Sequence, residues 1–239
     1  MTPPNQLDIL SPGAHHPLAE QFRDFIRDPA FPCVGAKSAL ARETMRILVA
    51  RDLASAWDDL RILPEIAKLA ADYRAAPALF QTLVVIFESP ATIDEADFER
   101  HLWERAQSLA DKDALWLGNP ADTRVSDDPD DPHFSLSFGG EAFFVVGLHP
   151  GASRPARRFE RPVLVFNLHD QFEQLRIQNR YEKLRAAILD RDVALAGSIN
   201  PMLARHGEES EAAQYSGRVV DENWQCPYAG RGGGLRDAA

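Results

Sequence analysis

The stretch FSLSFGGEAFFVVGLHP, residues 134–150, decides how the rest of the chain is interpreted. A short run of alternating apolar residues precedes Gly139 and Gly140, and a second apolar run then ends at His149. A glycine pair between two strand-like runs is typical of a tight turn, because glycine readily adopts positive φ angles. The stretch therefore predicts a β-hairpin and, with it, an antiparallel sheet.

Two further runs predict strands that could join this hairpin. LFQTLVVIFE (79–88) is rich in β-branched and aromatic residues, and PVLVFNLH (162–169) ends at a histidine, as the hairpin does. Such composition favours buried strands. Because strand ends meet at a sheet edge, His149 and His169 become candidate site residues.

Helical spacing of apolar residues predicts helices around these strands. The predicted helices cover residues 20–28, 36–53, 64–74, a segment within 88–112 capped by Thr92 or Asp94, and 170–195. Strands in hairpin order with helices on either side favour an α+β fold, a single domain with a mainly antiparallel sheet flanked by helices. The expected division is an irregular arm at 1–19, the domain at 20–228 and a flexible tail at 229–239.

Composition narrows the classes of function. The chain has 239 residues, and its 45% hydrophobic and 26% charged residues are ordinary for a globular protein. The run LFQTLVVIF (79–87) is too short to cross a bilayer, and the first ten residues lack the pattern of a signal peptide. A net charge of -10 argues against nucleic-acid binding. We therefore expect a cytoplasmic protein with no membrane and no nucleic-acid partner.

Four arginines follow the hairpin although the chain is acidic. Arg154, Arg157, Arg158 and Arg161 lie within eight positions, with Glu160 as the one acid among them. Guanidinium groups suit bidentate binding of carboxylate or phosphate. The segment is therefore a candidate anion site, although loop arginines are most often solvated.

Three residues are candidate ligands for iron. His149 ends a strand, Cys33 precedes a predicted helix whose dipole would stabilise a thiolate, and Cys226 lies beside Trp224. Each also has an ordinary structural reading, as a strand-end histidine or a small buried cysteine. The residues alone leave this choice open.

Standard catalytic motifs are absent from the sequence. It contains no GxGxxG, no GxxxxGK[ST], no HExxH and no GxSxG. Dinucleotide-binding, P-loop, zinc-hydrolase and serine-hydrolase interpretations are therefore weakened.

Several blocks in order resemble the YqcI/YcgG family. They are FPCVGAKSAL, HPGASRPARRF, FNLHDQFEQLR with RYEKLR, GSINPML, SEAAQYSGR and WQCPY, and the resemblance runs from about residue 20 to residue 228. Within this family, the chain is most similar to the branch typified by the haem-dependent N-hydroxylase of guanitoxin biosynthesis.

The resemblance implies a haem b protein that uses dioxygen and a separate electron donor to hydroxylate an amine or guanidino nitrogen of a small, arginine-like molecule. In that reading His149 is the first candidate for the iron ligand and Cys33 the second. Arg154, Arg157 and Arg158 would bind the haem propionates, and Trp224 would contact the macrocycle.

A guanidinium substrate would also need a carboxylate, for which Glu211 ranks before Glu209 and Asp170, with His169 as a second catalytic candidate. Two alternatives remain. One is a haem-binding or haem-sensing protein without turnover, and the other is a haem-free domain that binds an anionic metabolite.

Overall fold

The glycine hairpin at the centre of the sequence forms as predicted. In the computed structural model, β3 (Leu136–Phe138) and β4 (Glu141–Leu148) pair antiparallel, with Phe138 opposite Glu141. Gly139 and Gly140 have φ angles of 60° and 81°, which other residues adopt at a cost. The turn thus depends on the two glycines.

One sheet of five strands contains the hairpin, in the order β1-β2-β5-β4-β3. Three of its four pairings are antiparallel, whereas β1 (Met45–Asp52) and β2 (Thr82–Ser89) pair in parallel. The central strand β5 (Val163–Leu168) lies between β2 and β4. The single α+β domain with a mainly antiparallel sheet is therefore confirmed.

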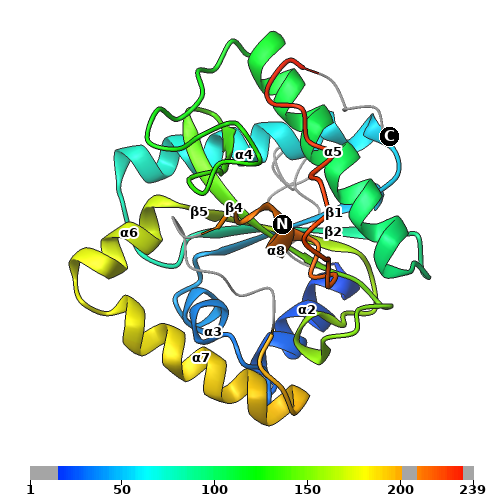
Figure 1. Ribbon diagram of the computed structural model, residues 1–239, viewed down its shortest axis with the longest axis vertical. Coiled ribbons are helices and arrows are strands. Elements are labelled where there is room, and N and C mark those ends of the chain that lie inside the picture. Colours follow the sequence, from blue (N-terminus) through cyan, green and yellow to red (C-terminus); the bar gives the residue numbers. More distant parts are fainter. Residues whose placement is uncertain (1–15, 201–208, 234–239) are drawn as a thin grey trace, which may run out of the picture.

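Helices cover the two faces of the sheet (Figure 1). On one face lie α4 (Asp59–Ala75) and α5 (Glu95–Leu115), and on the other α2 (Pro17–Arg27), α3 (Val34–Ala41) and α7 (Tyr181–Ala196). The short helices α6 (Asp170–Ile177) and α8 (Ala212–Tyr215) follow β5 and pack near β4, respectively. We name the two sides the α5 face and the α7 face.

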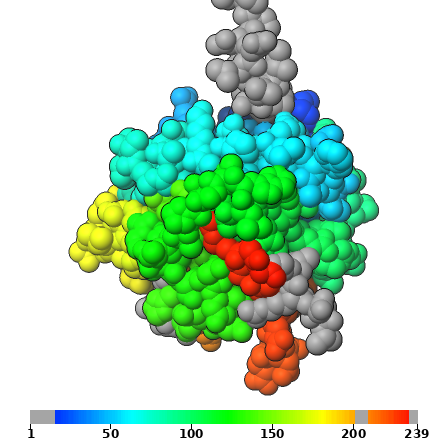
Figure 2. All heavy atoms as spheres, turned by 90° about the horizontal axis from the view of Figure 1, so that it is seen from above, coloured from blue at the N-terminus to red at the C-terminus, as the bar shows by residue number. Residues whose placement is uncertain are grey.

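The α5 face holds the larger core. Phe98, Leu102 and Trp103 of α5 are completely buried against strand residues such as Phe143 and Phe166. Figure 2 looks onto this side and shows α4 and α5 covering it, with C-terminal residues laid between the green segments. Arg231 ties that C-terminal segment down by donating to the carbonyl oxygens of Asn119 and Ser137, at 2.6 Å each.

Two predicted helices are each divided in the structure. Residues 36–53 were expected to form one helix, but α3 ends at Ala41, Glu43 adopts a φ of 57°, and Met45–Asp52 is strand β1. Residues 170–195 form α6 and α7, with Asn179 at a φ of 55° between them. In both places a single residue with positive φ stops the helix without a proline or glycine.

The structure describes residues 16–200 and 209–233. Most of the predicted arm, 1–15, and the end of the predicted tail, 234–239, lie outside these residues, while α2 begins inside the arm at Pro17. Within the described ranges, no helix has both the length and the apolar character that crossing a bilayer requires.

Candidate functional site

A cavity of about 370 Å³ lies on the α7 face of the sheet. Such a volume falls within the range of small-molecule sites. Its floor is made by strand side chains that point to the α7 face, whereas their neighbours along each strand point into the core of the α5 face. They come from β1, β2, β5 and β4 and include Met45, Thr82, Val84, Val165, Asn167, Phe144, Val146 and Leu148.

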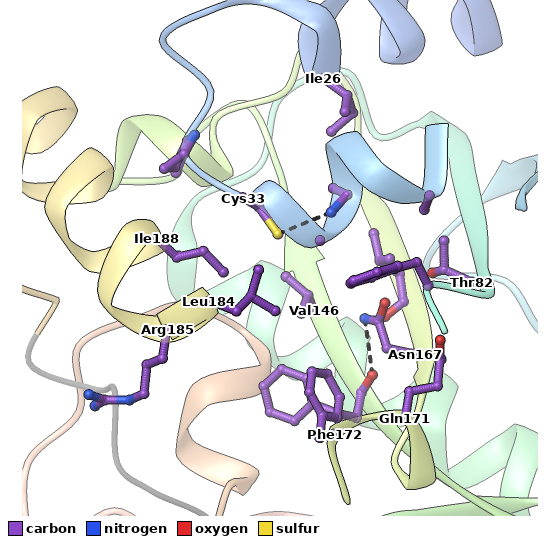
Figure 3. Close-up of a pocket in the computed structure, with 18 of the residues that line it drawn as sticks. Ile26, Cys33, Thr82, Val146, Asn167, Gln171, Phe172, Leu184, Arg185 and Ile188 are labelled. Atoms are coloured by element: carbon purple, nitrogen blue, oxygen red, sulfur yellow. Dashed lines mark hydrogen bonds between the residues drawn. The ribbon is translucent and has the colours of Figure 1, made fainter. Parts of the chain in front are cut away.

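The walls of the cavity come from helices and from the loop after β4. Residues from α2, the start of α3 and α6 line its sides, and α7 contributes Leu184, Arg185 and Ile188. In Figure 3, Leu184 and Ile188 project from α7 toward Cys33 and Val146. Because these α7 residues are only partly buried, the helix covers the cavity without a packed core beneath it.

Cys33 stands at the cavity wall, directly before α3. Its Sγ accepts a hydrogen bond from the backbone N–H of Ala36 at 3.4 Å, which makes Cys33 the N-terminal cap of the helix. Burial raises the pKa of the Cys33 thiol, while hydrogen bonds from the N–H groups of Ala36 and Gly35 act in the opposite direction. Without a bound metal the sulfur is thus held as a thiol, and a metal ion would favour the thiolate.

Two of the predicted arginines also line the cavity. Arg154 is buried, contacts Asp192 of α7 as an ion pair, and donates to Ser198 Oγ at 3.1 Å. Its Nε is buried without a hydrogen-bond partner. The ion pair of Arg154 and Asp192 therefore joins the loop after β4 to α7, and the Nε–H of Arg154 stays available as a hydrogen-bond donor.

Arg157 is held differently, entirely by main-chain oxygens. Its guanidinium donates to the carbonyls of Gly147, Gln214 and Tyr215 at 3.1, 2.8 and 2.9 Å. Gly217 makes room for it, because a Cβ there would lie 2.5 Å from Arg157 Cδ. Among the described residues Arg157 has no carboxylate in salt-bridge contact.

Burial and the nearby Arg154 lower the pKa of Arg157 to about 10, partly offset by Asp192. Two guanidinium groups and one carboxylate thus meet at this wall of the cavity. The arrangement leaves an excess positive charge where an anionic group of a ligand could bind.

Glu211 and His169 line the cavity as well. Glu211 is buried, and its Oε1 accepts hydrogen bonds from Ser135 Oγ at 2.6 Å and Tyr215 Oη at 2.8 Å. His169 precedes α6, and its backbone N–H donates to the Ala142 carbonyl at 2.8 Å. His169 also borders a second, polar pocket, together with Arg176 and Asp170.

The other predicted residues lie away from the cavity. His149 is 1% exposed on the α5 face, where its ring stacks on Phe98 at 4.3 Å and its Nδ1 has no hydrogen-bond partner. Trp224 donates to Glu99 at 3.3 Å, and Cys226 is buried in the same core. Arg158 is exposed and donates to the carbonyls of Ala152 and Ser153.

Thus the structure brings Cys33, Arg154, Arg157, His169 and Glu211 to one cavity, and separates them from His149, Arg158, Trp224 and Cys226. In the described part of the chain, no group of three or more histidine, cysteine, aspartate or glutamate residues could hold a metal ion. Cys33 and His169 are the two cavity residues whose side chains carry a thiol or an imidazole.

Sequence reasoning missed Asn167 and the α7 residues. Asn167 looked like one polar residue in an otherwise apolar strand, and that interruption is the signal that could have marked it. Leu184, Arg185 and Ile188 belong to a helix predicted without any contact to a site. These three residues line the cavity because α7 packs across the sheet, and that packing is seen only in the structure.

Comparison with known proteins places most of this chain in one group. Residues 22–229 match the profile described as the YqcI/YcgG family. Protein YqcI of Bacillus subtilis (strain 168), described as uncharacterized, is 27% identical over 217 residues, covering 84% of this chain and 82% of YqcI. No solved structure matches significantly. The range that matches the family contains all the cavity residues named above.

Proposed function

The chain belongs to the YqcI/YcgG family, and we propose that it is a haem-dependent monooxygenase whose iron is bound by Cys33 on the α7 face. The proposed reaction hydroxylates an amine or guanidino nitrogen of a small, arginine-like molecule. The similarity of the sequence blocks around Cys33 and Arg154 to the haem-dependent N-hydroxylase branch supports this choice. The structural observation that carries it is a cavity with a thiol at one wall and excess guanidinium charge at another.

The residues of the cavity suit haem in three respects. The lining is mainly apolar, as a macrocycle requires. Cys33 can ligate iron, and its position before α3 adds the helix dipole to the stabilisation of a thiolate. Arg154 and Arg157 can each donate to a propionate carboxylate. Arg158 is exposed, so we assign the anionic groups to the other two arginines.

His149 serves this proposal less well than Cys33. Its ring lies against Phe98 among the packed side chains of the α5 face, and it does not line the cavity. An iron ligand needs open space beside its donor atom for the metal and its macrocycle. We therefore move the ligand role from His149 to Cys33, and no contact of Trp224 with the macrocycle is retained.

Bound haem supplies the activation of dioxygen. In the balanced reaction one oxygen atom enters the N–H bond of the substrate and the other leaves as water, with two electrons and two protons taken up. The chain would need a separate reductase as electron donor. Its own residues would bind the cofactor, exclude bulk water by the apolar walls and orient the substrate nitrogen.

Glu211 remains the candidate carboxylate for a guanidinium substrate, because it is buried and lines the cavity. Because it already accepts hydrogen bonds from Ser135 and Tyr215, its first effect is to fix the start of α8 against the segment that precedes β3. His169 lines both the apolar cavity and the polar pocket, and its proposed role is to pass protons between them.

Haem uptake by matched cysteine variants tests the proposal. The wild-type protein and Cys226→Ala should take up haem and give the red-shifted ferrous-carbonyl Soret band of thiolate ligation, while Cys33→Ala should lose that band. Cys226 is the right control, since it is the second of the two cysteines and lies in the opposite core. A protein that takes up no haem, or a Cys33→Ala protein with an unchanged spectrum, would contradict the assignment.

Turnover separates an enzyme from a haem sensor. The haem-loaded protein, reduced without oxygen and then exposed to dioxygen with a panel of amines and guanidines, should yield an N-hydroxylated product detectable by mass spectrometry. Reoxidation at the same rate with and without each compound, and with no product, would favour a sensor.

A further inference from the structure

The floor of the cavity holds a polar group that neither the fold nor the haem proposal explains. Asn167 lies on the central strand β5, between Thr82 of β2 and Phe144 of β4. Its side chain faces the cavity from a floor that is otherwise mostly apolar, as Figure 3 shows. A carboxamide is costly at such a place unless its polar atoms find partners.

Main-chain carbonyls fix the orientation of this amide. Asn167 Nδ2 donates to the carbonyl oxygens of Phe144 and Val165, both at 3.4 Å. The reversed amide would place its oxygen against these two carbonyl oxygens, which repel it. The nitrogen therefore faces the sheet, and Oδ1 is the atom left for the cavity.

The neighbouring polar groups of the floor are already used. Gln171 accepts from the N–H of Gln81 and donates to its carbonyl, both at 2.7 Å. The hydroxyl of Thr82 donates to the Phe166 carbonyl at 3.0 Å. Of the carboxamides of Gln171 and Asn167, that of Asn167 is the one whose oxygen accepts no hydrogen bond within the described residues.

We propose that Asn167 is a specificity-determining residue, and that its Oδ1 selects cavity ligands that carry an N–H donor. Asn167 is partly buried, and a ligand in the cavity would cover its Oδ1. The acceptor then distinguishes a ligand with an N–H group from one of the same shape without it, because the second leaves Oδ1 unsatisfied. The selection belongs to the cavity itself, with or without a cofactor. Its extension to the nitrogen that is hydroxylated rests on the proposed function.

Indole and indene provide a matched pair of probes, since they have nearly the same shape and differ in the N–H group. Titration calorimetry on the haem-free protein should show indole binding about tenfold more tightly than indene, as one buried hydrogen bond allows. Asn167→Leu should reduce that ratio to about one. Thr82→Val, which removes a floor hydroxyl already bonded to the sheet, should leave the ratio of the two affinities at about ten.

Circular dichroism and thermal melting establish that each variant is folded, and Asn167→Val, which suits a strand, replaces Asn167→Leu if the latter is not. Equal affinities for the two probes in the wild-type protein would overturn the inference. An indole preference that survives in the folded Asn167 variant, or the absence of binding by both probes, would overturn it as well. Since these titrations use no haem, their result is independent of haem uptake.

Discussion

The two faces of one sheet serve different purposes in this protein. On the α5 face, large aromatic side chains of α5 are completely buried against the strands. On the α7 face, Asp192 is the one residue within Tyr181–Ala196 that counts as buried, and several apolar residues of this helix lie over a cavity. The α5 face thus provides the packing that stabilises the domain, and the α7 face provides the space in which a ligand can bind.

Cys33 and His149 illustrate the consequence of this division. Both are possible iron ligands by chemistry, but strand alternation sends His149 to the packed face, while Cys33 borders the open one. Position relative to the sheet therefore discriminates between residues that composition leaves equivalent.

The largest expected effect is on stability. Phe98→Ala should lower the free energy of unfolding by about 3–5 kcal/mol, because Phe98 is completely buried and its ring contacts His149. Ile188→Ala, on the cavity side of α7, should cost about 1 kcal/mol or less, because the side chain is only partly buried. Urea unfolding of both variants measures the difference. Equal losses would mean that the α7 face is packed as tightly as the α5 face.

A smaller effect is expected from pH. Burial lowers the pKa of His149 below its ordinary 6.5, with the charge of Arg157 adding to this and those of Glu95 and Asp94 opposing it. Below pH 6.5 the unfolded chain therefore takes up a proton that the folded protein resists. The contribution of neutral His149 to the free energy of unfolding is therefore fully present above pH 6.5 and decreases as the pH falls below that value.

His149→Gln should remove this contribution and flatten the stability profile between about pH 7 and pH 5. Urea unfolding midpoints across that range, compared with those of the wild type, provide the measurement. If the two profiles run parallel, His149 is not held neutral in the packed core, and its assignment to that core is incorrect.

Much of the sheet could be predicted because its signals are local. Gly139 and Gly140 identify the hairpin, and the apolar run in 79–88 identifies β2. Strand β1 was predicted as part of a helix, because MRILVARD contains a short run of consecutive apolar residues. The periodicity of so short a run does not distinguish a buried strand from a buried helix. Only its parallel pairing with β2 decides in favour of the strand.

The site was predictable to the extent that its residues have unusual chemistry. Cys33, Arg154 and Arg157 could be selected by type, and the structure brings them to the same cavity. Asn167 is marked in the sequence only as a polar interruption of an apolar strand, because its role depends on the apolar surroundings and on the carbonyls that orient it. One of these carbonyls, that of Phe144, belongs to strand β4, and its position next to Asn167 depends on strand pairing that the sequence does not show.

The central claim is that the α7 face, through Cys33, holds a haem iron. The most direct test is the anomalous scattering of iron in crystals of the haem-loaded protein. The account predicts one iron site bonded to Cys33 Sγ, inside the cavity floored by β2, β5 and β4. An iron site at His149 or Cys226, on the α5 face, would contradict it.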